Sequence, residues 1–108
     1  MQVTYDSKGV PDGIVVPASF GRAVIPFLRE NGYRVHKWAD LETGPAYIVK
    51  KSGAKTGLVV TPQEGDTDYL AMAVTFPGLM GLLKRNANRQ LRSELIETIG
   101  SHLTNSQR

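Results

Sequence analysis

The stretch PAYIVKKSGAKTGLVVT, residues 45–61, contains two runs of β-branched and aromatic side chains around the turn-forming triplet SGA. Two such runs joined by a short glycine-containing turn are typical of a β-hairpin. Short connections favour antiparallel neighbours, because a parallel pair needs a crossover of a dozen or more residues. The hairpin therefore predicts an antiparallel sheet around which the rest of the chain is arranged.

The segments on either side of this hairpin extend the predicted sheet. YRVHKW at residues 33–38 precedes the hairpin, and YLAMAVTF at residues 69–76 follows it with an alternating apolar pattern. Near the N-terminus, residues 2–5 and 13–16 read as short strands on either side of the turn-forming segment DSKGVPDG. We therefore expect an antiparallel sheet of four or more strands.

Residues 18–32 have the apolar spacing of a helix. The sequence Asn31-Gly32 is a typical helix end, because glycine adopts the left-handed conformation without a Cβ penalty. Pro26 lies inside this segment, lacks an amide donor and clashes with the preceding turn. We expect this proline to kink or restart the N-terminal helix.

A second helical segment, residues 77–103, ends the ordered part of the chain, and residues 104–108 are predicted to form a flexible tail. The chain of 108 residues is thus predicted to be a single α+β domain spanning residues 1–103. In this prediction, the N-terminal helix and one long or two short C-terminal helices pack on one face of the antiparallel sheet.

The apolar side chains of residues 77–103 change sides along a helical wheel. The first half of the segment places its apolar residues in a sector of about 100°, nearly opposite the apolar sector of the second half. One straight helix cannot press both sectors against the same sheet. Either the chain bends near residues 86–88, or the helix passes to a second apolar surface, such as that of a symmetry mate. We favour a bend, because asparagine is a mediocre helix former.

The composition excludes several classes of function. The chain has no cysteine, which excludes disulfides, thiolate metal sites and cysteine catalysis. The N-terminal residues lack the order of a signal peptide, and no apolar run approaches the roughly 20 residues that span a bilayer. We therefore expect a cytoplasmic protein with no membrane partner. No nucleotide-binding loop or His-Glu-x-x-His motif is present, so we expect no enzyme activity, no cofactor and no metal site.

The net charge of +3 is concentrated in GLLKRNANRQLRSEL, residues 81–95, which contains Lys84, Arg85, Arg89 and Arg92. On a continuous helix the three arginines lie within about 60° and form a stripe that runs into the apolar sector of the second half. Three interpretations remain open. The stripe is a solvated face, a protein-contact surface of the kind in which arginine is enriched, or a helix that reads nucleic-acid bases.

Two further groups are candidate binding residues. His36 and Trp38 share a strand face with Arg34, and such side chains are common at binding surfaces. The alternative is that the tryptophan packs against the sheet or a helix. Three lysines flank the SGA turn, namely Lys50, Lys51 and Lys55. They either contact phosphates or keep an exposed hairpin soluble.

Two parts of the chain resemble known families. From residue 20 the order is a helix, the strands NGYRV, AYIVKK, GLVVTP and DYLAMAVTF, and then LLKRNANRQL. Over residues 20–88 this order resembles the type III secretion chaperone-like domains, which implies a non-enzymatic, often dimeric, protein-binding module. The N-terminal VTYDSKGVPDGIVVPASFGRAV is similar to the swapped-hairpin DNA-binding domains of transition-state regulators.

The sequence thus predicts a small non-enzymatic protein-binding module, such as an adaptor, a chaperone or an inhibitor, which acts through a C-terminal helical surface. Its predicted partner is another protein or a second copy of itself. The partner-binding residues that we expect are Lys84, Arg85, Arg89, Arg92, Trp38 and His36. The alternative is a nucleic-acid-binding protein that uses the basic stripe of residues 84–92.

Overall fold

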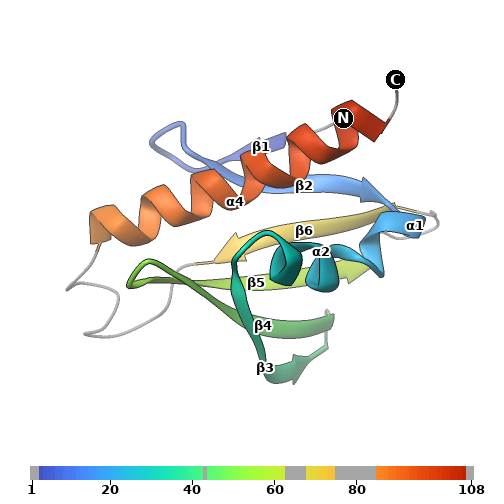
Figure 1. Ribbon diagram of the computed structural model, residues 1–108, viewed down its shortest axis with the longest axis horizontal. Coiled ribbons are helices and arrows are strands. Elements are labelled where there is room, and N and C mark those ends of the chain that lie inside the picture. The colour runs from blue at the N-terminus through green and yellow to red at the C-terminus, as the bar shows by residue number, and fades with distance from the viewer. Residues whose placement is uncertain (1–2, 43, 63–67, 75–84, 107–108) are drawn as a thin grey trace.

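The structure is a computed structural model that describes residues 3–42, 44–62, 68–74 and 85–106 (Figure 1). Its strands form one antiparallel six-stranded sheet in the order β1-β2-β6-β5-β4-β3. The strands are β1 (Val3–Tyr5), β2 (Pro11–Pro17), β3 (Arg34–Leu41), β4 (Gly44–Lys51), β5 (Ala54–Pro62) and β6 (Asp68–Val74). The helices are α1 (Ala18–Gly21), α2 (Val24–Glu30) and α4 (Arg85–Ser106). The predicted α+β class, antiparallel pairing and C-terminal helix are confirmed.

The hairpin predicted at residues 45–61 consists of β4 and β5. Lys51 pairs with Ala54 across a two-residue loop, in which Ser52 and Gly53 have φ angles of 52° and 83°. Two consecutive positive φ angles twist a two-residue loop in the same sense as the flanking strands, and glycine adopts them without a steric cost. The neighbouring strand β3 was predicted to end at Trp38, but it continues to Leu41. Its pairing with β4 shifts register between Lys37 and Ala39.

One face of the sheet and the inward sides of α2 and α4 form the hydrophobic core. The sheet contributes Ile14, Val16, Val35, Val49, Ala54, Leu58, Val60, Ala71 and Ala73, and Tyr33 joins them from the position just before β3. The helices contribute Val24, Leu28, Leu91, Leu95, Ile96, Ile99 and Leu103. Helix α4 crosses β2, β6 and β5, while α2 packs against β3. Figure 1 shows these helices on the same side of the sheet.

Two short helices take the place of the single N-terminal helix that was predicted. The first ends at Gly21 and the second begins at Val24, so the break lies upstream of Pro26. The proline is the third residue of α2, where its missing amide costs no intrahelical hydrogen bond. Gly21 permits the close approach of α1 to β6, since an added Cβ would lie 2.6 Å from Cγ of Tyr69.

The predicted bend near residues 86–88 is wrong, because α4 is one continuous helix of 22 residues from Arg85 to Ser106. The side chain of Asn88 does not compete with the helix. It is buried, and its Oδ1 accepts a hydrogen bond of 2.9 Å from the backbone amide of Lys55. The helix also extends through residues 104–106, which were predicted to belong to the flexible tail. Residues 77–84, which carry most of the first apolar sector, lie outside the described residues.

Within the described ranges, no helix is both long enough and apolar enough to cross a membrane.

Candidate functional site

The described part of the predicted basic stripe, Arg89 and Arg92, turns toward the protein rather than fully toward solvent. Arg92 is only 8% exposed, and Arg89 is half-buried. The Nε atom of Arg89 is buried without a hydrogen-bond partner in the described part of the chain. Lys84 and the side chain of Arg85 lie outside the residues that can be placed. A helix that reads bases must present its cations to solvent, so this geometry does not favour the nucleic-acid interpretation of the stripe.

Both arginines lie in the electrostatic field of the β1–β2 hairpin. Burial lowers the pKa of Arg92; Asp6 and Asp12 oppose this shift, while Arg89 adds to it. The pKa of Asp6 is lowered first by hydrogen bonds from the amides of Val10 and Lys8, and then by the charges of the two arginines. The charges of these arginines and of the hairpin acids therefore attract one another across the space between α4 and the hairpin.

His36 and Trp38 lie on β3, at the opposite edge of the sheet from β1. Both side chains are exposed, and Trp38 is 57% exposed, so the tryptophan is not packed under a helix. Trp38 lies at the register shift in β3, next to an ion pair of 2.7 Å between Lys37 and Asp40. The structure thus does not bring His36 and Trp38 together with the arginines of α4.

The lysines of the β4–β5 hairpin, in contrast, do lie near the start of α4. The amide of Lys55 donates to Asn88, and Nζ of Lys51 donates to Oε1 of Glu94 at 2.7 Å. Lys51 also lies over the ring of Tyr33, with 4.6 Å between Nζ and the ring centroid. The carboxylate of Glu94 raises the pKa of Lys51.

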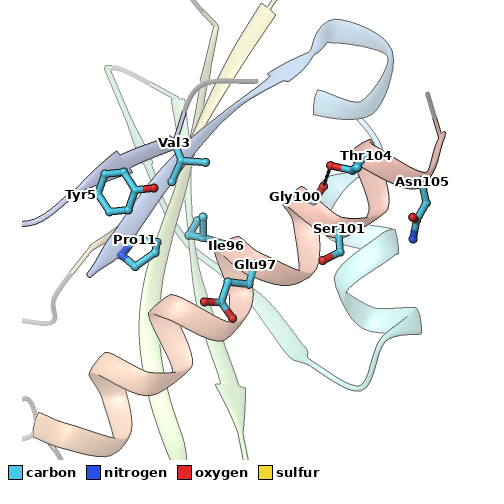
Figure 2. Close-up of a pocket in the computed structure, with 9 residues that line it drawn as sticks. All are labelled: Val3, Tyr5, Pro11, Ile96, Glu97, Gly100, Ser101, Thr104 and Asn105. Carbon is cyan, nitrogen blue, oxygen red and sulfur yellow. Dashed lines mark hydrogen bonds between the residues drawn. The ribbon is translucent and has the colours of Figure 1, made fainter. Parts of the chain in front are cut away.

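A groove lies between the β1–β2 hairpin and the C-terminal half of α4 (Figure 2). Its volume is about 580 Å³, which lies within the range of about 300–1,000 Å³ that is typical of ligand sites. The hairpin side consists of Val3, Tyr5 and Pro11, and the helix side consists of Ile96, Glu97, Gly100, Ser101, Thr104 and Asn105.

The groove has an apolar floor and a polar rim. Ile96 is 1% exposed, and Val3 packs against the same core, so the floor is held by the interior of the protein. Tyr5 is 61% exposed, the highest value among the large apolar side chains of the described residues. On the helix side, Oγ1 of Thr104 donates a 2.9 Å hydrogen bond to the carbonyl of Gly100 (Figure 2). Glu97 is exposed and places a carboxylate at the rim.

The strand beside this groove forms one edge of the sheet. β1 pairs with β2 on its inner side, and no strand of the described residues pairs with its outer side. An unpaired edge presents a row of backbone donors and acceptors to a further strand. A strand added to β1 would point alternate side chains toward the face on which α4 lies, and thus into the groove.

Sequence reasoning missed this groove. The alternation of Val3 and Tyr5 around a polar residue predicted a strand but not its edge position. The apolar sector that contains Ile96 predicted which side of the C-terminal helix faces the core. It did not predict what lies next to that side. The two walls come from residues more than 80 positions apart, so local patterns do not predict their contact.

Comparison with known protein families, with curated proteins and with solved structures finds no match to this chain. Among the residues that the structure describes, no three potential metal ligands from histidine, cysteine, aspartate and glutamate are grouped together.

Proposed function

We propose that this protein is a protein-binding module whose groove between β1 and α4 receives an extended segment of a partner protein. The observation that carries the proposal is the combination of an apolar groove with the open edge of β1, on which Tyr5 is 61% exposed. The partner segment adds a strand to β1, so that main-chain hydrogen bonds supply affinity. Its alternate side chains enter the groove and supply specificity.

The floor of the groove selects apolar side chains in the partner segment. Each aliphatic side chain of the partner that becomes fully buried in the groove contributes about 1.5–3 kcal/mol. Tyr5 has the properties of an anchor residue, because tyrosine combines a large contact area with few rotatable bonds. Glu97 at the rim favours a basic residue in the partner, although a rim charge affects the association rate more than the affinity.

This proposal retains the predicted class of function but moves the surface. The C-terminal helix still forms one wall, but the wall is the groove-lining face of its C-terminal half rather than the basic stripe. A protein-binding role is also what the resemblance of residues 20–88 to type III secretion chaperone-like domains implies. The burial of Arg92 weighs against the alternative of a base-reading helix.

The proposal is tested by selection from a displayed library of random linear peptides, followed by titration of an enriched synthetic peptide into the isotope-labelled full chain. We expect enriched peptides with apolar residues at alternate positions. We also expect their binding to shift the amide resonances of β1 and of Glu97 to Asn105. Selected peptides that shift only the resonances of β3, or a library without enrichment, would contradict the proposal.

Matched variants locate the binding. Thr104→Trp places an indole in the groove, and Tyr5→Ala removes the aromatic anchor. Each is expected to weaken peptide binding by about tenfold or more, which corresponds to about 1.4 kcal/mol. Gln90→Trp is the control, because Gln90 is an exposed residue of the same helix that does not line the groove. Equal affinities for Thr104→Trp and Gln90→Trp would place the peptide elsewhere.

A further inference from the structure

Three cations form a row across three neighbouring strands, on the sheet face that points away from α4. Arg34 on β3 pairs with Lys50 on β4, and Lys50 pairs with Lys55 on β5. We call these three residues the cationic row. Each member of the row has a buried neighbour in its strand. Val35 follows Arg34, Val49 precedes Lys50, and Thr56 follows Lys55. Because successive side chains alternate between the faces of a sheet, the row lies on the face opposite the core.

This arrangement is unfavourable for the protein alone. Directly opposite residues of an antiparallel pair have Cβ atoms about 4.5–5.5 Å apart, and like charges at this distance destabilise the pairing. The ion pairs of the described residues join Lys37 to Asp40 and Lys51 to Glu94, and neither includes a member of the row. No described acid therefore offsets the repulsion by an ion pair.

The cationic row borders a cavity at the β4–β5 hairpin. Its volume is about 410 Å³, and no acidic side chain of the described residues lines it. The lining residues are Gly32, Arg34, Lys50, Lys51, Ser52, Gly53, Ala54 and Lys55. Lys51 is already engaged by Glu94 on the other side of the strand. The cavity thus combines the three cations of the row with the hydroxyl group of Ser52, which together form an environment for an anion.

We propose that this cavity binds a ligand that carries consecutive phosphate groups. Adjacent strands lie about 4.8 Å apart, so the row spreads its charges over about 10 Å across three strands. A chain of phosphates matches this spread better than one compact anion. Arg34 supplies a planar fork that pairs with two phosphate oxygens, and the lysines act as point charges on neighbouring phosphates.

The site is independent of the peptide groove. It lies on β3, β4 and β5, whereas the groove lies between β1 and α4. The shared chemistry is a row of phosphates, and its sources are a linear polyphosphate or the phosphodiester backbone of a single-stranded nucleic acid.

The test is titration of the isotope-labelled full chain with sodium tripolyphosphate and, separately, with an oligothymidylate, at constant ionic strength. We expect at least one probe to give saturable shifts of the amide resonances of Arg34 and of Ser52 to Lys55. Lys50→Gln removes the middle charge and is expected to weaken that binding by about fivefold or more and to lower its salt dependence. Lys8→Gln is the control, because Lys8 is exposed on the β1–β2 turn and lines neither cavity.

Saturation by tripolyphosphate alone would identify a polyphosphate ligand, and saturation by the oligothymidylate alone would identify a nucleic-acid backbone. Either result supports the site when Lys50→Gln weakens the binding. Absence of saturation with both probes at low salt would overturn the proposal, as would equal binding by Lys50→Gln and Lys8→Gln. A thermal melt adds a second readout. Without phosphate, Lys50→Gln is expected to unfold at the same temperature as the wild type or above it, and a lower value would remove the argument from repulsion.

Discussion

The two edges of the sheet each expose an aromatic side chain, but their surroundings are opposite. Tyr5 on β1 is 61% exposed and borders a groove that α4 closes on its other side. Trp38 on β3 is 57% exposed and lies at a register shift, next to the ion pair of Lys37 and Asp40. Exposure of an aromatic residue therefore does not by itself distinguish the edge at which we propose docking. The presence of a backing helix and an apolar floor distinguishes the two edges.

The β3 edge has the features by which proteins protect a long edge strand. A bulge disturbs its register, and charged side chains, among them a lysine, line its surface. β1 is protected in a different way, because a strand of three residues offers few backbone groups to a passing chain. The partner that we propose for β1 would therefore need additional affinity from the groove, and this would make the proposed interaction selective for segments with suitable side chains.

The largest effect that we expect separates the two edges by their connection to the core. Ile96→Ala removes a side chain that is 1% exposed at the floor of the groove and is expected to lower the free energy of unfolding by about 2–5 kcal/mol. Trp38→Ala is expected to lower it by less than about 1 kcal/mol. Urea denaturation measures both values. If the two variants were equally unstable, Trp38 would belong to the core, and the contrast between the edges would be lost.

The second prediction concerns the anchor that sets the position of α4. Asn88→Ala leaves the amide of Lys55 without its acceptor and is expected to cost about 1–3 kcal/mol. Asn86→Ala is the control, because Asn86 is an exposed residue of the same helix and its replacement is expected to change stability by about 0.5 kcal/mol or less. Hydrogen exchange adds a local readout, since a loosened helix should expose the amides along the groove. Unchanged protection in α4 would show that Asn88 does not position this wall.

The β4–β5 hairpin was predictable from sequence because its signals are local. Two β-branched runs and a glycine turn carry the information within residues 45–61. The continuity of α4 was not predictable in the same way. The low helix propensity of asparagine favoured a bend, but Asn88 forms a tertiary hydrogen bond with β5, and tertiary contacts override propensity.

The candidate sites were less predictable than the fold. The helical spacing of the arginines predicted a stripe, but the sequence did not show what lies opposite Arg89 and Arg92. Asp6 and Asp12 of the β1–β2 hairpin contribute to the field that acts on Arg92. The cationic row depends on strand register across three strands, which a pattern along the chain does not reveal.

A third prediction tests whether charge protects the β3 edge. Replacement of Lys37 and Asp40 by valine removes the ion pair and makes the edge more apolar and more β-prone. We expect a concentration-dependent increase in mass in sedimentation velocity, although the bulge at Trp38 remains and should keep the association weak. Replacement of Ser7 by valine, in the β1–β2 turn, is the control and is expected to leave the mass unchanged. A double variant that sediments like the wild type would assign the protection to the bulge alone.

The smallest effect that we expect is a pH dependence that belongs to the β1 side only. The pKa of Asp6 is lower in the folded protein than its ordinary value of 3.8, because the amides of Val10 and Lys8 and the charges of Arg89 and Arg92 stabilise the carboxylate. The stability that this interaction supplies is complete above about pH 4 and is lost as the pH falls through the lowered pKa. Asp6→Asn keeps an oxygen acceptor for the turn but removes the charge.

Urea denaturation of the wild type and of Asp6→Asn at a series of pH values between about 2 and 6 measures this contribution. We expect the variant to have a lower free energy of unfolding than the wild type at about pH 6. The difference between the two free energies should disappear as the pH falls. Parallel curves would show that the carboxylate charge does not stabilise the fold. Convergence together with loss of amide protection in β1 at low pH would show that charge holds the hairpin against α4. The groove would then depend on pH through the contact that forms one of its walls, whereas the β3 edge has no part in that contact.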